Sequence, residues 1–421
     1  MSGGPLRGIT VVEFGRFIAV PYCGQLLADA GARVVKVEPL EGDATREHGI
    51  IVPGEGRQYL NKNRGKESVS LNLRAAAGVE IARRLAARAD VVLANFRPQL
   101  AASLALDYAS LRAVNPRVIY AATTAFGTLG EDADQPGFDV VVQAYSGLYA
   151  SLAPHDDRPP DPGLPLTDYV AAVLLAWGVM LALWERAQTG EGQEVATSLL
   201  AASLVLQNNR LTHIDAIDGW RHDFLRRLPD LKVGRPWGEI NQVATAMQPQ
   251  QVHPAYTNAY HTADGTIVIA CYGRPLQRRL LTLLNLDDPW VTDPAWEAPE
   301  DPRPHMHRVY HAVAAAMRTR TTAAWLRAFR AAGIPASEVR HWAEMLDHQQ
   351  AQANGLVHRF EHDRVGGVTT VGPPVQLSRT PLQPAFPPRP LGADTVPVLA
   401  ELGYGHETIA RFIEEGVVRV A

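Results

Sequence analysis

Cysteine is rare in this chain, and no stretch is apolar for long enough to cross a membrane. The 421 residues include two cysteines, Cys23 and Cys271, which excludes a disulfide framework and a paired cysteine metal motif. The N-terminus lacks the basic segment and apolar stretch of a secretory signal. The longest uncharged apolar run, residues 169–184, is shorter than the ~20 residues that span a bilayer, so it predicts a buried core helix. We therefore expect a cytoplasmic protein with no membrane segment.

Neither sign of charge is in large excess, and lysine is scarce. The formal net charge is −4 with 20% charged residues, which gives no indication of a nucleic-acid partner. The composition is that of a globular protein, and 421 residues exceed one ordinary core, so two domains are expected. In so arginine-rich a chain a retained lysine suggests a place for a compact charge, although chance is the simpler explanation. The only lysines are Lys36, Lys62, Lys66 and Lys232.

The N-terminal part has the pattern of a βαβ unit. Residues 8–14 and 33–38 are β-branched runs typical of buried strands, and the segment between them has a helical pattern over 22–30. This predicts a parallel sheet. Glu38 stands at the end of the second strand, where a dinucleotide-binding domain has an acidic residue that holds a ribose. No G-x-G-x-x-G joins the first strand to its helix, however, so NAD binding is disfavoured.

Further strands direct polar and aromatic loops toward one crevice. The strand at 90–94 is followed by Asn95, Phe96 and Arg97, and the strand at 118–123 leads into a loop ending at 138–139. Carboxyl ends of parallel strands are where open α/β sheets bind ligands. Residues 61–68 also carry three positive charges, which suit phosphates or a solvated turn.

The chain divides by composition into three parts. Residues 1–210 read as a large domain, and 221–251 are polar with no clear period, so we place a boundary there. Residues 225–335, with two strands and three helical segments, predict a smaller α+β domain. Residues 350–421 carry a proline-rich passage that suits an extended arm, followed by a terminal helical part.

Asp168 stands where the long apolar helix begins. At or just before a first helical turn, unpaired N–H groups and the helix dipole favour an ionised carboxylate. A plain N-cap is the simplest role for such a residue.

Many short segments, in one order along nearly the whole chain, together resemble the class III CoA-transferases, which include formyl-CoA:oxalate and carnitine CoA-transferases. The segments are residues 6–9, 12–14, 26–32, 35–39, 42–46, 63–68, 95–98, 115–116, 137–139, 189–193, 333–336 and 401–404.

The resemblance implies a fold, a nucleophile and a CoA site. It implies an α/β protein with a Rossmann-like large domain formed by both chain ends, a smaller α+β middle domain, and two subunits interlocked as a homodimer. Asp168 matches the family's catalytic aspartate. No tightly bound cofactor and no metal is implied; coenzyme A enters as acyl-CoA substrate. The implied CoA-binding residues are Phe17, Ile18, Ala19, Asn63, Arg64, Lys66, Asn95, Phe96, Arg97, Phe138 and Asp139.

The residue types at these positions suit CoA. Arg64, Lys66 and Arg97 can meet phosphates, while Phe96 and Phe138 can flank the adenine or the pantetheine arm. Core packing is an equally good explanation for Phe96. Formyl-CoA transferases have basic residues at positions that are Pro39 and Ser103 here, so we expect the 3′-phosphate to be held differently, by Arg46 or Arg97.

The implied reaction is the transfer of CoA from an acyl-CoA donor to a carboxylic acid acceptor. Asp168 attacks the thioester to give a mixed anhydride, and the released thiolate then forms an aspartyl-CoA thioester. Backbone N–H groups near Asp168 or in the 17–19 turn are candidate oxyanion donors. Ile18 replaces a family glutamine, and residues 247–251 replace a glycine loop that covers the aspartate, so we expect a larger or more apolar acid than oxalate.

Two alternatives remain. An α-methylacyl-CoA racemase shares the fold and pairs this aspartate with a histidine about 30 residues upstream. Here the corresponding triplet is Gly137, Phe138 and Asp139, and His155 is the one nearby histidine that could approach. A non-catalytic acyl-CoA-binding protein is the alternative from another class, and the intact Asp168 argues against it.

Overall fold

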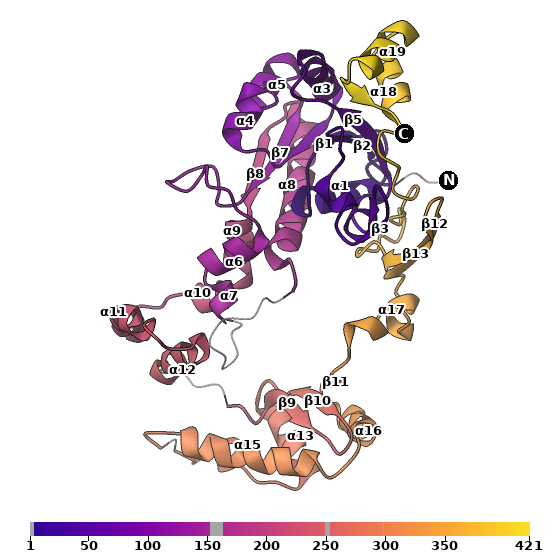
Figure 1. The fold of residues 1–421 in the computed structure, drawn as a ribbon. Helices are drawn as coiled ribbons and strands as arrows, with labels where there is room; N and C mark the ends of the chain where they lie inside the picture. The colour runs from indigo at the N-terminus through magenta and orange to yellow at the C-terminus, as the bar shows by residue number, and fades with distance from the viewer. Residues whose placement is uncertain (1–3, 152–162, 249–252, 298) are drawn as a thin grey trace. The chain divides into compact units, whose positions relative to one another are not determined.

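The protein forms two compact units. The computed structural model describes residues 4–151, 163–248, 253–297 and 299–421 (Figure 1). One unit combines Met1–Val243 with Gln349–Ala421, and the other is Ala244–His348. Residues 225–243, which composition assigns to the smaller domain, lie in the first unit.

A seven-stranded sheet organises the first unit. Its order is β14-β5-β2-β1-β6-β7-β8, parallel throughout except for the edge strand β14, which pairs antiparallel with β5. The predicted α/β class and the parallel sheet are confirmed. The strands are β1 (Thr10–Phe14), β2 (Arg33–Glu38), β5 (Lys66–Leu71), β6 (Val91–Ala94), β7 (Ile119–Thr124), β8 (Glu194–Ser198) and β14 (Val418–Arg419).

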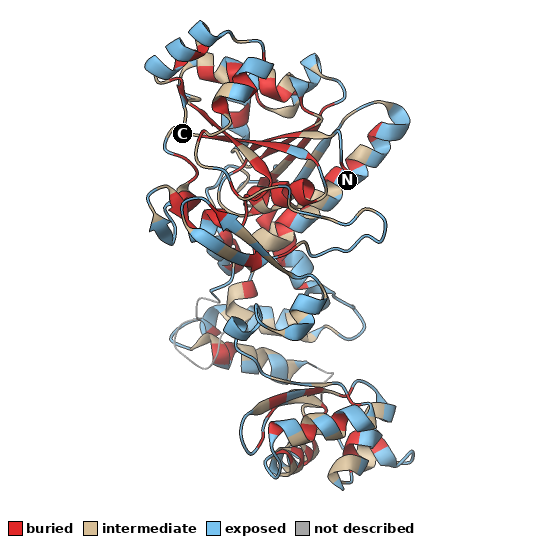
Figure 2. Ribbon diagram, turned by 90° about the vertical axis from the view of Figure 1, so that its right-hand side faces the viewer, coloured by how far each residue is buried: buried red, intermediate tan, exposed pale blue. Residues whose placement is uncertain are grey.

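Helices cover both faces of this sheet, which explains why the central strands β1 and β2 are buried on both sides (Figures 1 and 2). Within β1 the side chains alternate: Val11 joins the core cluster that includes Val34, and Val12 joins the opposite cluster with Val35. The first face is covered by α1 (Ala19–Asp29) and α8 (Leu166–Thr189), and the second by α3 (Ala76–Arg88), α18 (Thr395–Glu401) and α19 (His406–Glu414).

The strand order reverses at β1, because β2 lies on one side of it and β6 on the other. Open α/β sheets bind ligands at such a switch point, outside the carboxyl ends of the strands. The turns that follow β1 and β6 therefore define where a site is expected.

Helix α8 is buried on one side only. Leu175 and Val179 are fully buried against the sheet, whereas Trp177 and Trp184 are 62% and 70% exposed. The helix has 24 residues and is longer than the uncharged run at 169–184, so the expectation that this segment is too short to cross a membrane is wrong. Among the described residues it is the helix that length and composition would allow to do so, a test that core helices also pass. The prediction of a buried core helix is wrong for the outer face, because the sequence is apolar all round while the sheet covers one side.

Some polar segments form helices and strands that the sequence pattern does not indicate. Residues 221–251, which show no clear period, contain α11 (Trp220–Leu231) and α12 (Trp237–Met247). Strand β13 (Gly366–Val371) pairs antiparallel with β12 (Val357–His362), whose polar sequence gives little indication of a strand. The remaining elements of this unit are β3 (Ile50–Val52), β4 (Glu55–Gly56), α2 (Arg57–Leu60), α4 (Pro98–Ser103), α5 (Tyr108–Val114), α6 (Asp139–Tyr145), α7 (Leu148–Ser151), α9 (Leu199–Leu206), α10 (Asn208–Leu211) and α17 (Gln349–Ala353).

The second unit is a small antiparallel sheet packed with helices around its own core. The sheet order is β11-β10-β9, with both pairs antiparallel. Its elements are β9 (Thr257–His261), β10 (Thr266–Ala270), α13 (Arg274–Leu284), α14 (Pro289–Thr292), α15 (Arg303–Met317), α16 (Thr322–Ala332) and β11 (Ala336–Glu338).

Candidate active site

Asp168 lies inside the first turn of α8 and does not cap it. The residue before the helix is Pro165, which makes no side-chain cap. The missing acceptor comes from Asp139, the first residue of α6. Its Oδ1 accepts the backbone N–H groups of Thr167 at 2.8 Å and Asp168 at 3.1 Å, and also the Thr167 hydroxyl at 2.5 Å. The N-cap prediction for Asp168 is therefore wrong: Asp139, 29 residues upstream, satisfies the helix N-terminus and fixes the backbone of Asp168.

A second helix N-terminus faces the Asp168 carboxylate. Ala19 is the first residue of α1, and its backbone N–H lowers the pKa of the Asp168 carboxyl. The preceding turn is held from the end of β6, because the Asn95 amide donates to the carbonyl of Arg16 at 2.9 Å and accepts its N–H at 3.1 Å. Phe17 in this turn has φ of 67°, a left-handed conformation that is rare for a bulky side chain. The turn at the topological switch point thus presents a donor to the carboxylate.

Asp168 is nevertheless hard to ionise. Burial, and then the negative charge of Asp139, raise its pKa from 3.8 to about 7, against the opposing effects of Lys62 and of the Ala19 N–H. The helix N-termini therefore do not keep this carboxylate fully charged, contrary to the expectation from its position alone. Near neutral pH both the ionised and the protonated forms of Asp168 are therefore populated.

Lys62 is a charged neighbour that the sequence motifs do not single out. Its ammonium is fully buried and donates to the Gln58 carbonyl at 2.9 Å, the Gln58 side chain at 2.7 Å and the Asn61 side chain at 2.8 Å. These partners are neutral, and burial lowers the pKa of Lys62 to about 8. Two signals in the sequence include Lys62: the scarcity of lysine and the three positive charges at residues 61–68.

The other two basic residues of this segment are engaged with protein groups. Arg64 donates to both carboxylate oxygens of Asp29, at 3.0 and 2.7 Å. Lys66 lies 2.8 Å from a Glu13 oxygen and donates to the side chain of Asn63 at 2.8 Å. All these side chains are buried. The structure therefore gives Arg64, Lys66 and Asn63 protein partners, whereas the sequence predicts phosphates beside Arg64 and Lys66.

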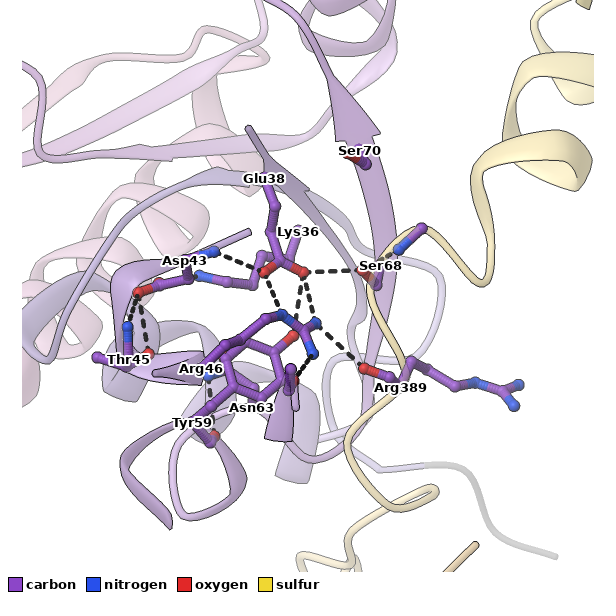
Figure 3. Close-up of polar contacts among 12 residues, drawn as sticks. Lys36, Glu38, Asp43, Thr45, Arg46, Tyr59, Asn63, Ser68, Ser70 and Arg389 are labelled. Atoms are coloured by element: carbon purple, nitrogen blue, oxygen red, sulfur yellow. Dashed lines mark hydrogen bonds and ion pairs between the residues drawn. The ribbon is translucent and has the colours of Figure 1, made fainter. Parts of the chain in front are cut away.

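Arg46 belongs to a buried ionic cluster next to this segment (Figure 3). Its guanidinium donates twice to Glu38, at 2.8 Å each, and lies 3.6 Å from the centre of the Tyr59 ring. The Tyr59 hydroxyl also donates to Glu38, while Lys36 pairs with Asp43 at 3.1 Å. Glu38 thus serves to hold Arg46 and not a ribose, and Arg46 is not available to a 3′-phosphate.

The aromatic candidates separate into two groups. Phe138 is 59% exposed and meets the ring of Phe17 edge-on, with 5.2 Å between centroids. Phe96 is half-buried and packs on Phe14 at 5.7 Å, so the core-packing explanation describes its contact. Ile18 precedes α1 and is half-buried.

Arg97 is exposed and precedes α4. Within the described ranges its guanidinium has no hydrogen bond or ion pair, unlike that of Arg64. The structure thus brings together Phe17, Ala19, Asn95, Phe138, Asp139 and Asp168. Arg97 is exposed, as is Arg16 in the turn itself.

No histidine in the described part of the chain is paired with Asp168. His48 is exposed, with its ring centroid 6.3 Å from that of Phe17. His155 lies outside the described residues, as do 249–251 of the segment compared with the glycine loop.

Comparison with known proteins assigns the chain to an enzyme family. The chain matches CoA-transferase family III over residues 6–395 and belongs to that family. It is 32% identical to the succinate–glutarate CoA-transferase of Agrobacterium fabrum, covering 97% of each chain. It is 29% identical to the human succinyl-CoA:glutarate CoA-transferase, covering 98% of this chain and 90% of the relative.

A solved structure agrees with this assignment. The crystal structure of Rv3272 from Mycobacterium tuberculosis superposes with a TM-score of 0.76 at 27% identity, covering 94% of this chain and 99% of that one. The protein is therefore a class III CoA-transferase that acts on acyl-CoA.

Proposed function

We propose that this enzyme transfers CoA from an acyl-CoA to a carboxylic acid through covalent intermediates on Asp168. The observation that carries the proposal is a half-buried carboxylate at the switch point, whose pKa the Ala19 N–H lowers and whose backbone N–H donates to Asp139. A carboxylate positioned beside an open, aromatic-lined turn can act as a nucleophile.

The reaction proceeds in two exchanges. Ionised Asp168 attacks the thioester carbonyl, the C–S bond breaks, and CoA leaves as thiolate from a mixed anhydride. The thiolate attacks the aspartyl carbonyl, which releases the donor acid and leaves an aspartyl-CoA thioester. The acceptor carboxylate repeats these steps in reverse and leaves as the new acyl-CoA. Each addition forms an oxyanion, and the Ala19 N–H together with the buried charge of Lys62 are the groups that favour negative charge here.

The CoA site is proposed around the turn after β1. The edge-on pair of Phe17 and Phe138 offers apolar surface for the pantetheine arm, and the exposed Arg97 offers a charge for a phosphate. Because two similar enzymes are named for succinate and glutarate, we propose a dicarboxylic acid among the acceptors. The enzyme is proposed to work in the cytoplasm without a tightly bound cofactor.

The outer face of α8 supports a homodimer. Val173, Trp177, Met180, Leu181 and Trp184 are large apolar side chains that are 44–70% exposed on one helix. Patches of this kind mark protein interfaces, and a second copy of the chain is the proposed cover. Trp177→Glu should shift the sedimentation coefficient to that of a monomer; an unchanged dimer would contradict this interface.

One observation favours a second candidate. A carboxyl pKa of about 7 is well suited to acid/base chemistry on the carbon next to the thioester, the reaction of a racemase. The two reactions separate in D2O. Transfer predicts that CoA reaches the added acid with no deuterium at the α-carbon of recovered acyl-CoA. Rapid α-deuteration without any transfer would replace the proposal by racemisation.

A further inference from the structure

The second unit contains a group of two imidazoles and one carboxylate that lies outside the CoA site. Its members are His253, Asp288 and His305, whose nearest nitrogen and oxygen atoms all lie within 4.8 Å of one another. Nε2 of His305 is 2.7 Å from Oδ1 of Asp288, and Nε2 of His253 is 3.6 Å from Oδ2. The side chains are 8%, 0% and 9% exposed in chain order.

The fold holds the carboxylate at the centre of this group. Asp288 caps α14, because its Oδ1 accepts the backbone N–H of Trp290 at 3.0 Å. The hydroxyl of Tyr256 donates to Oδ2. His305 stands in the first turn of α15, with the ring of Trp296 5.2 Å away. Asp288 is therefore fixed before any ligand arrives.

Hydrogen bonds satisfy the polar atoms of Asp288 and His305, but Nε2 of His253 makes none with the described residues. Within the described residues, Nε2 of His253 is buried without a hydrogen-bond partner while it faces Oδ2 of Asp288. Buried polar atoms are normally satisfied, so such an atom needs an explanation. Two imidazole nitrogens and one carboxylate oxygen are a donor set that binds Zn²⁺ with one position left open. A metal ion among the three groups would satisfy this nitrogen.

We propose that the His253, Asp288 and His305 group binds a divalent transition metal of the Zn²⁺ type, and that the ion stabilises residues 244–348. The donors are spread over more than fifty positions, so no motif in the sequence indicates them. The ion takes the place of the proton between His305 and Asp288. Nδ1 of each imidazole accepts a hydrogen bond, from the exposed Arg308 at 2.8 Å in His305 and from the Ala255 N–H at 3.3 Å in His253. When the metal binds at Nε2, Arg308 must turn toward solvent and the His253 ring must move off the Ala255 N–H, so that each Nδ1 can carry the ring proton. Binding therefore weakens as the pH falls.

The test uses the full chain, freed of metal with a chelator and titrated with Zn²⁺ by calorimetry. We expect one buried Zn²⁺ per chain and a higher melting temperature with Zn²⁺. His253→Gln removes the Nε2 that makes no hydrogen bond, and the glutamine side-chain oxygen can accept the Ala255 N–H that Nδ1 accepts at 3.3 Å, so the variant should keep its circular dichroism spectrum. It should lose at least about tenfold in Zn²⁺ affinity, together with the thermal shift.

A surface pair on α15 provides the matched control. His307 and His311 are exposed, one helical turn apart, with ring centroids separated by 6.2 Å, and could chelate an ion by themselves. His311→Gln should leave the tight binding intact. Zn²⁺ binding that survives His253→Gln and disappears in His311→Gln would overturn the proposal.

A spectroscopic measurement on the unmodified chain does not depend on any variant folding. Co²⁺ held by His253, Asp288 and His305 in a low-coordinate site should give intense visible d–d bands that Zn²⁺ displaces. Only the weak spectrum of six-coordinate aqueous Co²⁺ at saturating metal would refute the site.

Discussion

Removing the charge of Asp139 should make Asp168 easier to ionise. Asp139→Asn keeps an oxygen that can accept the N–H groups of Thr167 and Asp168, so the cap on α8 is largely preserved. The charge that raises the pKa of Asp168 is lost.

The expected size follows from the causes of the shift. The pKa of Asp168 rises from 3.8 to about 7, a rise of about three units, with burial as the first cause and Asp139 as the second. Two unit charges about 6 Å apart at an effective dielectric constant of about 20 interact by about 2.8 kcal/mol, or about two pKa units. Since burial is the larger cause, we expect a fall of about one unit, which is about 1.4 kcal/mol.

The assay is the pH dependence of kcat/KM, which reports the ionisation of the free enzyme. With the nucleophile ionised above its pKa, activity falls as the pH drops through about 7 in the unmodified enzyme. In Asp139→Asn the acid limb should move down by about one unit, which makes the variant about fivefold faster relative to its own plateau at pH 6. Glu131→Gln, at an exposed carboxylate on the preceding loop, is the matched control and should not move the limb. An acid limb that stays in place or moves up in Asp139→Asn would refute this account of the site.

Three further substitutions distinguish the roles of the basic residues. Lys62→Met removes the positive charge that lowers the pKa of Asp168. The acid limb of kcat/KM of this variant should therefore move to higher pH, and a limb that moves to lower pH would contradict the role assigned to Lys62. Arg64→Ala leaves Asp29 buried and unpaired, so chemical denaturation should show a loss of about 3–5 kcal/mol, and an unchanged unfolding free energy would rule out the structural role. Arg97→Ala should raise KM for acyl-CoA by about tenfold or less and leave kcat nearly unchanged, as expected when an exposed contact to a phosphate is lost. An unaltered KM would show that Arg97 is not part of the CoA site.

Local pattern was sufficient for much of the fold. The strands β1 and β2 are predicted to within a few residues because they are buried on both faces and are therefore rich in β-branched apolar residues. Helices α11 and α12 are missed because their exposed surfaces are polar, and β12 because a strand with few apolar residues is specified by its pairing with β13.

The site depends more on contacts between distant residues. Resemblance and helix position together locate Asp168, but the groups that set its chemistry come from elsewhere in the chain. Asp139 acts through a hydrogen bond across 29 positions. The basic cluster at 62–66 suggests a phosphate site, yet Arg64 finds its partner 35 residues away in Asp29. A short sequence window contains none of these partners. The positive charges in the sequence therefore could not show whether the cluster forms buried ion pairs or a phosphate-binding loop.

The central claim is that Asp168 becomes covalently bound to CoA. The direct measurement is mass spectrometry of peptides from enzyme incubated with acyl-CoA, with and without hydroxylamine. The account predicts a CoA adduct on the peptide containing Asp168, its conversion to a hydroxamate by hydroxylamine, and neither product in Asp168→Ala. An adduct on another residue, or transfer that continues in Asp168→Ala, would contradict it.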